Sequence, residues 1–127
     1  MTCFWDHILK SLNKEDLQMI GLNYPTTNTL FIDSLQKNNK LCENVTWQNK
    51  SLKKQLLEEN LLMVKEFNSQ NINKGYDCST CDPFLILLSE LLKVDIDHLY
   101  QDILIQYRVK NSRKLLNFKS TSSHFYI

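Results

Sequence analysis

Residues 81–92, CDPFLILLSELL, are the stretch from which the fold can be predicted most directly. On a helical wheel, apolar side chains occur on nearly every side of this segment, and a helix that is apolar all round is buried. Thr80 or Asp82 can cap the start of the helix, and Pro83 is tolerated in a first turn, where its missing N–H would be unpaired anyway. The pattern therefore predicts a buried central helix that starts near Cys81.

The chain changes character after this helix. Gln101-Asp102 and Asn111-Ser112 are candidate turns, and they separate segments rich in β-branched and aromatic residues. We expect strands from these segments at 93–100, 102–109 and 114–120. Consecutive strands joined by short turns favour an antiparallel meander, and residues 122–127, SSHFYI, would start a fourth strand or finish the third.

Helices are predicted upstream of the central helix. Apolar residues recur at helical spacing in residues 4–12, Asn13 and Gly21 can close the two ends of a second short helix, and Pro25 precedes a third. Residues 52–64 form the clearest amphipathic pattern in this part, and CENVTW at 42–47 favours a short strand.

Helices first and strands last predict an α+β domain, in which the central helix lies against a small C-terminal antiparallel sheet. The 127 residues are enough to bury a core without metal or disulfides, so we expect a single domain over 1–127. Its helical part covers 1–67, and a second part covers 75–127.

Composition disfavours several classes of function. The 15 basic and 14 acidic residues are mixed along the chain and give a net charge of +1, so we expect no nucleic-acid partner. No apolar run approaches the roughly 18 residues of a membrane span, and the N-terminal residues do not resemble a secretory signal. We therefore expect an intracellular, cytoplasmic protein whose cysteines are thiols, metal ligands or catalytic groups rather than disulfides.

Cys78 and Cys81 stand three residues apart, and this spacing allows three interpretations. The first is a redox pair, although a polar loop stands where a strand is expected before such a motif. The second is zinc, with Cys3 and His7 on one helix face completing a four-ligand set. The third is a single nucleophile with a bystander.

The nucleophile hypothesis favours Cys81, because unpaired N–H groups and the dipole at a helix start stabilise a thiolate. Cys78 becomes the alternative nucleophile if the helix begins earlier. The reaction also needs a base, and His124 is the best histidine for this role, since it follows a Ser-rich turn at the start of a strand. His7 and His98 are interpreted as ordinary packing or strand residues.

Taken together, CDPFLILLSELL, VDIDHLY, ILIQYRV and RKLLNFKSTSSHFYI resemble the core of the ovarian-tumour (OTU) family of papain-like cysteine proteases, particularly its compact viral members. The resemblance covers roughly residues 75–127. In that family a loop with Gly and Asp leads to a nucleophilic cysteine at a helix start, and a late strand carries a histidine followed by an aromatic residue. Cys81 and the pair His124-Phe125 match those two places.

The sequence departs from the family at two points. Cys78 stands three residues before Cys81 where the family has an Asp-Gly-x-Cys motif, and the nearest acid is Asp77. Tyr126 stands two residues after the histidine, where the family often has an Asp or Asn that orients the ring. Either a Cys-His dyad operates, or Asp77 or another loop residue orients His124, or the domain is inactive.

The resemblance implies a cysteine hydrolase that cleaves ubiquitin or ubiquitin-like conjugates, or that processes a viral polyprotein. It implies no cofactor, no catalytic metal and no membrane, and a location in the host cytoplasm if the protein is viral. His124 would take the Cys81 proton, and backbone N–H groups of residues 77–81 would stabilise the oxyanion. The alternatives are a catalytically inactive OTU-like module for protein interaction and a small zinc-stabilised adaptor.

Overall fold

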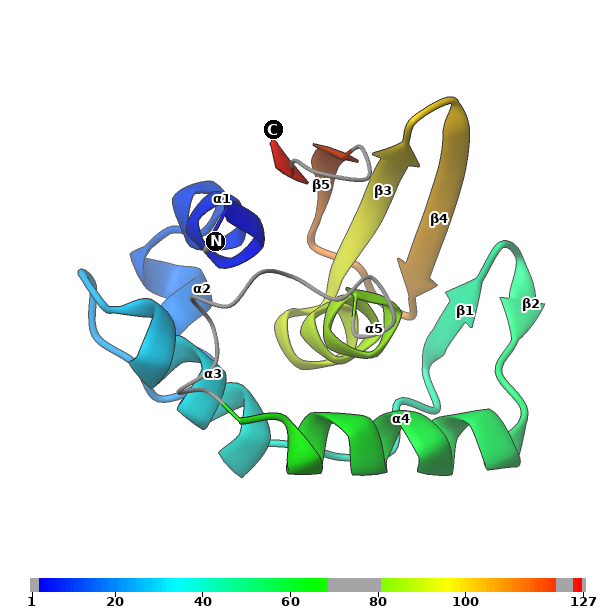
Figure 1. The fold of residues 1–127 in the computed structure, drawn as a ribbon, viewed down its shortest axis with the longest axis horizontal. Helices are drawn as coiled ribbons and strands as arrows, with labels where there is room; N and C mark the ends of the chain where they lie inside the picture. Colours follow the sequence, from blue (N-terminus) through cyan, green and yellow to red (C-terminus); the bar gives the residue numbers. More distant parts are fainter. Residues whose placement is uncertain (1–2, 69–80, 121–124, 127) are drawn as a thin grey trace.

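The computed structural model describes residues 3–68, 81–120 and 125–126. Within these ranges helices pack around α5, which lies against a mixed β-sheet (Figure 1), so the α+β class is confirmed. The helices are α1 Cys3–Ser11, α2 Lys14–Gln18, α3 Asn28–Lys37, α4 Lys54–Glu66 and α5 Cys81–Leu92. The strands are β1 Val45–Trp47, β2 Lys50–Ser51, β3 Val94–Tyr100, β4 Ile103–Val109, β5 Lys114–Ser120 and β6 Phe125–Tyr126.

Helix α5 is the predicted central helix. Its side chains from Phe84 to Leu88 are at most 2% exposed, because the helix contacts the sheet on one side and α4 on another. A single residue with positive φ, Lys93 at 54°, reverses the chain directly into β3. The Ser89 hydroxyl donates a 2.6 Å hydrogen bond to the carbonyl of Val94 across this reversal. The prediction of a buried helix that begins near Cys81 is therefore confirmed.

The order of strands in the sheet is β2-β1-β4-β3-β5-β6. Strands β3 and β4 form the expected antiparallel hairpin, and β6 is the expected fourth strand, antiparallel to β5. The meander is wrong at β5, however, because β5 lies beside β3 rather than β4 and runs parallel to it, from Val94 opposite Lys114 to Tyr100 opposite Ser120.

A hairpin from the N-terminal half explains this difference. Strand β1 pairs with the outer edge of β4, so that edge has no room for β5. The chain instead passes the start of β3, where the Arg113 N–H donates to the Lys93 carbonyl at 2.7 Å, and β5 takes the other edge of β3. The hairpin of β1 and β2 turns at Gln48 and Asn49, both with positive φ as a tight hairpin turn requires.

The N-terminal helices follow the predicted start and stop signals. Asn13 and Asp16 form a capping box at the start of α2, Gly21 has a φ of 79° after its end, and Thr27 caps α3. Asp16 is fully buried, and its carboxylate accepts from Arg113 at 2.7 Å and Lys114 at 2.6 Å. These ion pairs connect α2 to the start of β5, about a hundred residues away in sequence.

Aromatic contacts connect α1 to α5. The rings of Trp5 and Phe84 meet edge to face with their centroids 4.8 Å apart, and Phe67 contacts both of them. Trp5 and Phe84 both stand in the first turn of their helix, so this ring contact connects the first turns of α1 and α5. Buried residues of the helical part and of the later strands consequently belong to one hydrophobic core.

Candidate functional site

Cys81 is the first described residue of α5, and the nucleophile hypothesis expects the helix to start near it. The unpaired N–H groups and the positive end of the dipole of a helix are found at such a start. The Cys81 side chain, together with Asp77, Cys78 and His124, lies outside the described residues. The site is therefore built from the described side chains that surround the start of α5.

Asp82 links the first turn of α5 to the sheet. The hydroxyl of Tyr107, on β4, donates a hydrogen bond to Asp82 Oδ1. Tyr107 is fully buried, because it lies on the face of the sheet that α5 covers. Asp82, the residue after Cys81, is thus held in place by a hydrogen bond from the buried Tyr107.

His98 is the second polar residue on this face of the sheet. It lies on β3 in the alternation that also buries Val94 and Ile96, and it is only 3% exposed. Its Nε2 atom is 2.6 Å from the hydroxyl oxygen of Ser120, near the end of the parallel strand β5. His98 was predicted to be an ordinary strand residue, although the strand alternation already indicated that it faces inward.

The electrostatics of this pair favour a neutral imidazole. Burial lowers the pKa of His98, and the negative charge of Asp82 opposes that shift without cancelling it. A neutral imidazole can accept a proton, whereas an imidazolium can only donate one. The described part of the site therefore contains a buried imidazole, His98, whose neutral form is the one that a general base or a positioning group needs.

The position of His124 in the chain is defined by its neighbours. Strand β6 begins at Phe125, the next residue, and Phe125 stands opposite Ser120. Ser120 is in turn the partner of His98. In sequence, the predicted base His124 therefore stands between Ser120, which contacts His98, and Phe125, which pairs with Ser120.

Helix α1 is the helix packed against β6 (Figure 1). It begins at Cys3, a residue that the sequence analysis considered only as a zinc ligand. Trp5 in the first turn of α1 contacts Phe84 in the first turn of α5, and the first described residue of each of these helices is a cysteine. The signal in the sequence was the helical pattern that directly follows Cys3.

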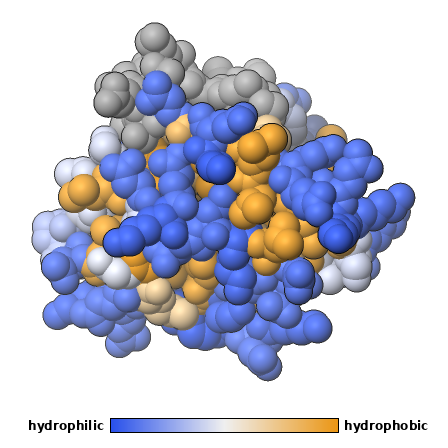
Figure 2. All heavy atoms as spheres, turned by 90° about the horizontal axis from the view of Figure 1, so that it is seen from below, coloured by the Kyte–Doolittle hydropathy of each residue, from blue (hydrophilic) through white to orange (hydrophobic). Residues whose placement is uncertain are grey.

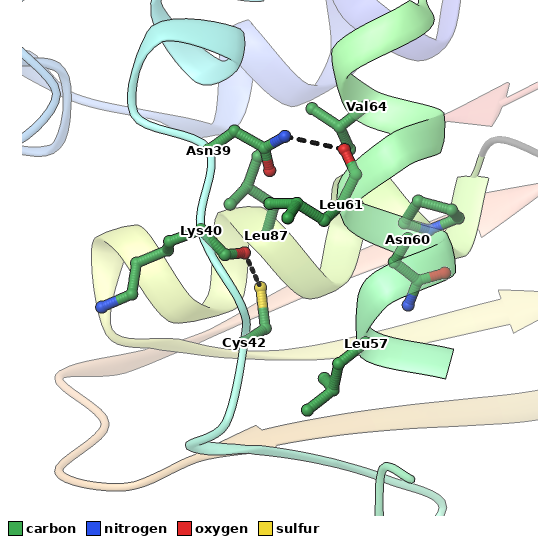
Figure 3. Close-up of a pocket in the computed structure, with 9 residues that line it drawn as sticks. Asn39, Lys40, Cys42, Leu57, Asn60, Leu61, Val64 and Leu87 are labelled. Atoms are coloured by element: carbon green, nitrogen blue, oxygen red, sulfur yellow. Dashed lines mark hydrogen bonds between the residues drawn. The ribbon is translucent and has the colours of Figure 1, made fainter. Parts of the chain in front are cut away.

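Cys42 differs from the other cysteines because its side chain lies within the described residues. It is 6% exposed, and burial, reinforced by the charge of Glu90, raises its pKa to about 12. Its sulfur lies 3.6 Å from the Lys40 carbonyl beside a cavity of about 10 Å³ (Figure 3). A thiol in this state is a packing residue, so Cys42 is a poor nucleophile.

Two further predictions concern metal and membrane. In residues 3–68, 81–120 and 125–126 no three His, Cys, Asp or Glu side chains are grouped as metal ligands would be. The proposed zinc set includes Cys78 and the side chains of Cys3 and Cys81, which lie outside that description, so zinc stays a hypothesis. Among the described helices none is long and apolar enough to cross a membrane.

Comparisons of this chain with protein-family models, with curated proteins and with solved structures found no match.

Proposed function

We propose that the protein is an OTU-like cysteine hydrolase that cleaves ubiquitin or ubiquitin-like conjugates in the cytoplasm, with Cys81 as nucleophile and His124 as base. The observation that carries the proposal is the start of α5. A buried helix begins at Cys81, and two polar pairs, Asp82 with Tyr107 and His98 with Ser120, lie where that helix packs against the sheet. The N–H groups and the dipole at a helix start favour a thiolate, and ionisable groups buried beside such a start are typical of functional sites.

The proposed reaction has two steps. His124 accepts the Cys81 proton, and the thiolate attacks the carbonyl carbon of the isopeptide bond. The carbon–nitrogen bond then breaks, and the amine leaves with the proton held by His124. Water hydrolyses the resulting thioester, which releases the carboxylate and restores the thiol. Backbone N–H groups at the start of α5 would bind the oxyanion, and the backbone at Asp77, in the preceding loop, would add to this oxyanion site.

Cys3 is a second candidate for the nucleophile in the same reaction. Support for it comes from α1, which begins at Cys3 and contacts β6, the strand that follows His124. A thiolate at the start of α1 would gain from the helix dipole as one at α5 would. The substrate class and the role of His124 are the same in both versions.

A ubiquitin probe with a thiol-reactive C-terminus tests the proposal. We expect a one-to-one adduct by mass spectrometry that is absent in Cys81→Ala and is retained in Cys42→Ala, the matched control at a buried thiol. His124→Ala is expected to slow adduct formation by about a hundredfold or more, because a positioned base contributes that much. An adduct that survives Cys81→Ala but disappears in Cys3→Ala assigns the nucleophile to α1, and one that disappears only in Cys78→Ala assigns it to the preceding loop.

The absence of any adduct would refute the hydrolase. The two alternatives then separate by other measurements on the same protein. An inactive interaction module would still bind ubiquitin in a pull-down. A zinc-stabilised adaptor would contain one zinc per chain, lose it in Cys78→Ser, and unfold with a chelator.

A further inference from the structure

Helix α3 and residues 19–22, which follow α2, line a groove with a volume of about 350 Å³. Helix α3 lies on the far side of the molecule from the hairpin of β3 and β4 (Figure 1). None of the described residues of α5 lines this groove. The α3 groove is therefore a feature of the surface that is separate from the candidate functional site.

Large apolar side chains are exposed along the α3 groove. Leu30 is 54% exposed and Met19 is 46% exposed, and both belong to its lining together with Leu22. Figure 2 shows the side of the molecule on which α3 and α4 lie, and apolar side chains stand there in separate groups among hydrophilic ones. Since the apolar groups are separated in this way, we expect charged side chains to select what binds the groove.

Asp33 and Lys37 are the charged residues that line the α3 groove. They stand four residues apart on the exposed face of α3, yet neither forms an ion pair with the other or with any other described residue. Their order along the helix makes this face complementary to a second copy of itself. When two α3 helices lie antiparallel about a two-fold axis, Asp33 of each copy faces Lys37 of the other.

The same two-fold arrangement brings the apolar side chains together. The Ser34 hydroxyl donates a 2.5 Å hydrogen bond to the Ile20 carbonyl, so residues 19–22 lie beside the second half of α3. Leu30 stands in the first turn of α3. Antiparallel packing sets the first half of one helix against the second half of the other, and Leu30 of one copy consequently meets Met19 and Leu22 of the other.

We propose that the protein forms a symmetric dimer through the α3 groove, with the α3 helices of the two copies packed antiparallel. Asp33 of one copy binds Lys37 of the other, and this ion pair occurs twice in each dimer. Leu30 of each copy covers the apolar wall of the other. A second copy fits because it carries both the cation and the anion where the groove needs them. The inference does not rest on the proposed hydrolase, since none of these residues belongs to the candidate functional site.

Sedimentation equilibrium of the full chain over a concentration series measures the association. We expect the average mass to rise from 15.0 kDa towards twice that value as the concentration increases. Asp33→Lys and Lys37→Asp should each raise the dissociation constant of the dimer about tenfold or more, because each replaces two attractive contacts per dimer by two repulsive ones. The matched control is Glu58→Lys, which makes the same change of charge at an exposed position of α4 and should have no effect.

A mixture of the two charge variants tests the antiparallel arrangement itself. The α3 face of Asp33→Lys carries two lysines, and that of Lys37→Asp carries two aspartates. The equimolar mixture should therefore form a heterodimer with an affinity close to that of the wild-type dimer, although each variant alone associates weakly. Both variants should keep the wild-type melting temperature, because the two side chains are exposed.

The apolar part of the interface has its own pair of variants. Leu30→Ser should weaken the dimer, whereas Leu62→Ser, at a leucine of similar exposure on α4, should leave it unchanged. A wild-type chain that stays monomeric at every concentration would overturn the proposal. So would a mixture of the two folded charge variants that does not associate, or equal weakening of the dimer by Leu30→Ser and Leu62→Ser.

Discussion

At the scale of single residues, the most informative side chain is one that the sequence did not single out. His98 stands on a strand with no motif around it, yet it is buried between α5 and the sheet and contacts Ser120 at 2.6 Å. Cys42 shows the opposite case, since burial raises its pKa to about 12 and makes it a packing residue. Burial and partners, which depend on other segments, decide the chemistry of both.

His98 should make the stability of the protein depend on pH. Its pKa is lowered from the ordinary value of 6.5, so below that pH the unfolded chain takes up a proton that the folded chain does not. The free energy of unfolding should therefore fall as the pH drops below about 6.5, until the folded pKa is reached. In His98→Gln, which keeps a polar group near Ser120, this part of the slope should disappear.

Urea denaturation at a series of pH values measures this effect. If the free energy of unfolding changed with pH in the same way for wild type and His98→Gln, the imidazole would titrate alike in the folded and unfolded chains. The interpretation of His98 as a neutral buried imidazole would then be wrong.

At the scale of elements, the clearest result is how each helix begins. Helices α2 and α3 have side-chain caps at Asn13 and Thr27. Helix α4 has none, because its N-cap residue is Lys53, whose side chain makes no capping bond, and Lys54 follows it. Positive charge at a helix start opposes the dipole. The stability of α4 therefore depends on its packing through Leu57 and Val64.

Lys53→Asp should stabilise the protein by about 1 kcal/mol, since Lys53 already has the extended backbone of an N-cap and Asp can bond the free N–H groups. Thermal or urea unfolding measures the change. The matched variant is Lys65→Asp, the same charge change in the last turn of α4, which should destabilise it. Stabilisation by both substitutions would point to net charge rather than to capping.

At the scale of the whole molecule, contacts between distant segments hold the helices and the sheet together. Trp5 packs on Phe84, strand β1 pairs with β4, and Asp16 binds Arg113 and Lys114. Burial would raise the pKa of Asp16, but the hydrogen bonds from these two cations hold it below its ordinary value. Asp16 therefore contributes stability above the pKa of an unfolded Asp, and this contribution is lost as the pH falls through the lower folded pKa.

The Asp16 ion pairs can be tested by a double-mutant cycle. Replacing both Arg113 and Lys114 by Ala leaves the buried Asp16 carboxylate without a cation, with the Asn13 N–H as its remaining partner, and should cost about 3 kcal/mol or more. The same two substitutions in an Asp16→Asn background should cost much less, because no charge is then left unpaired. Equal losses in the two backgrounds, measured by urea unfolding at neutral pH, would show that the cations stabilise the fold through other contacts.

The sequence by itself determined the α+β class, the helices and the buried central helix that begins at Cys81, because these follow from local periodicity and capping. It also indicated the strands, but their partners depend on which edges are free. Only the tertiary structure decided that β1 takes the edge of β4 and that β5 runs parallel to β3. The pairing of His98 with Ser120 depends on that strand arrangement, and the contact of Trp5 with Phe84 depends on how the helices pack. No local pattern specifies either contact.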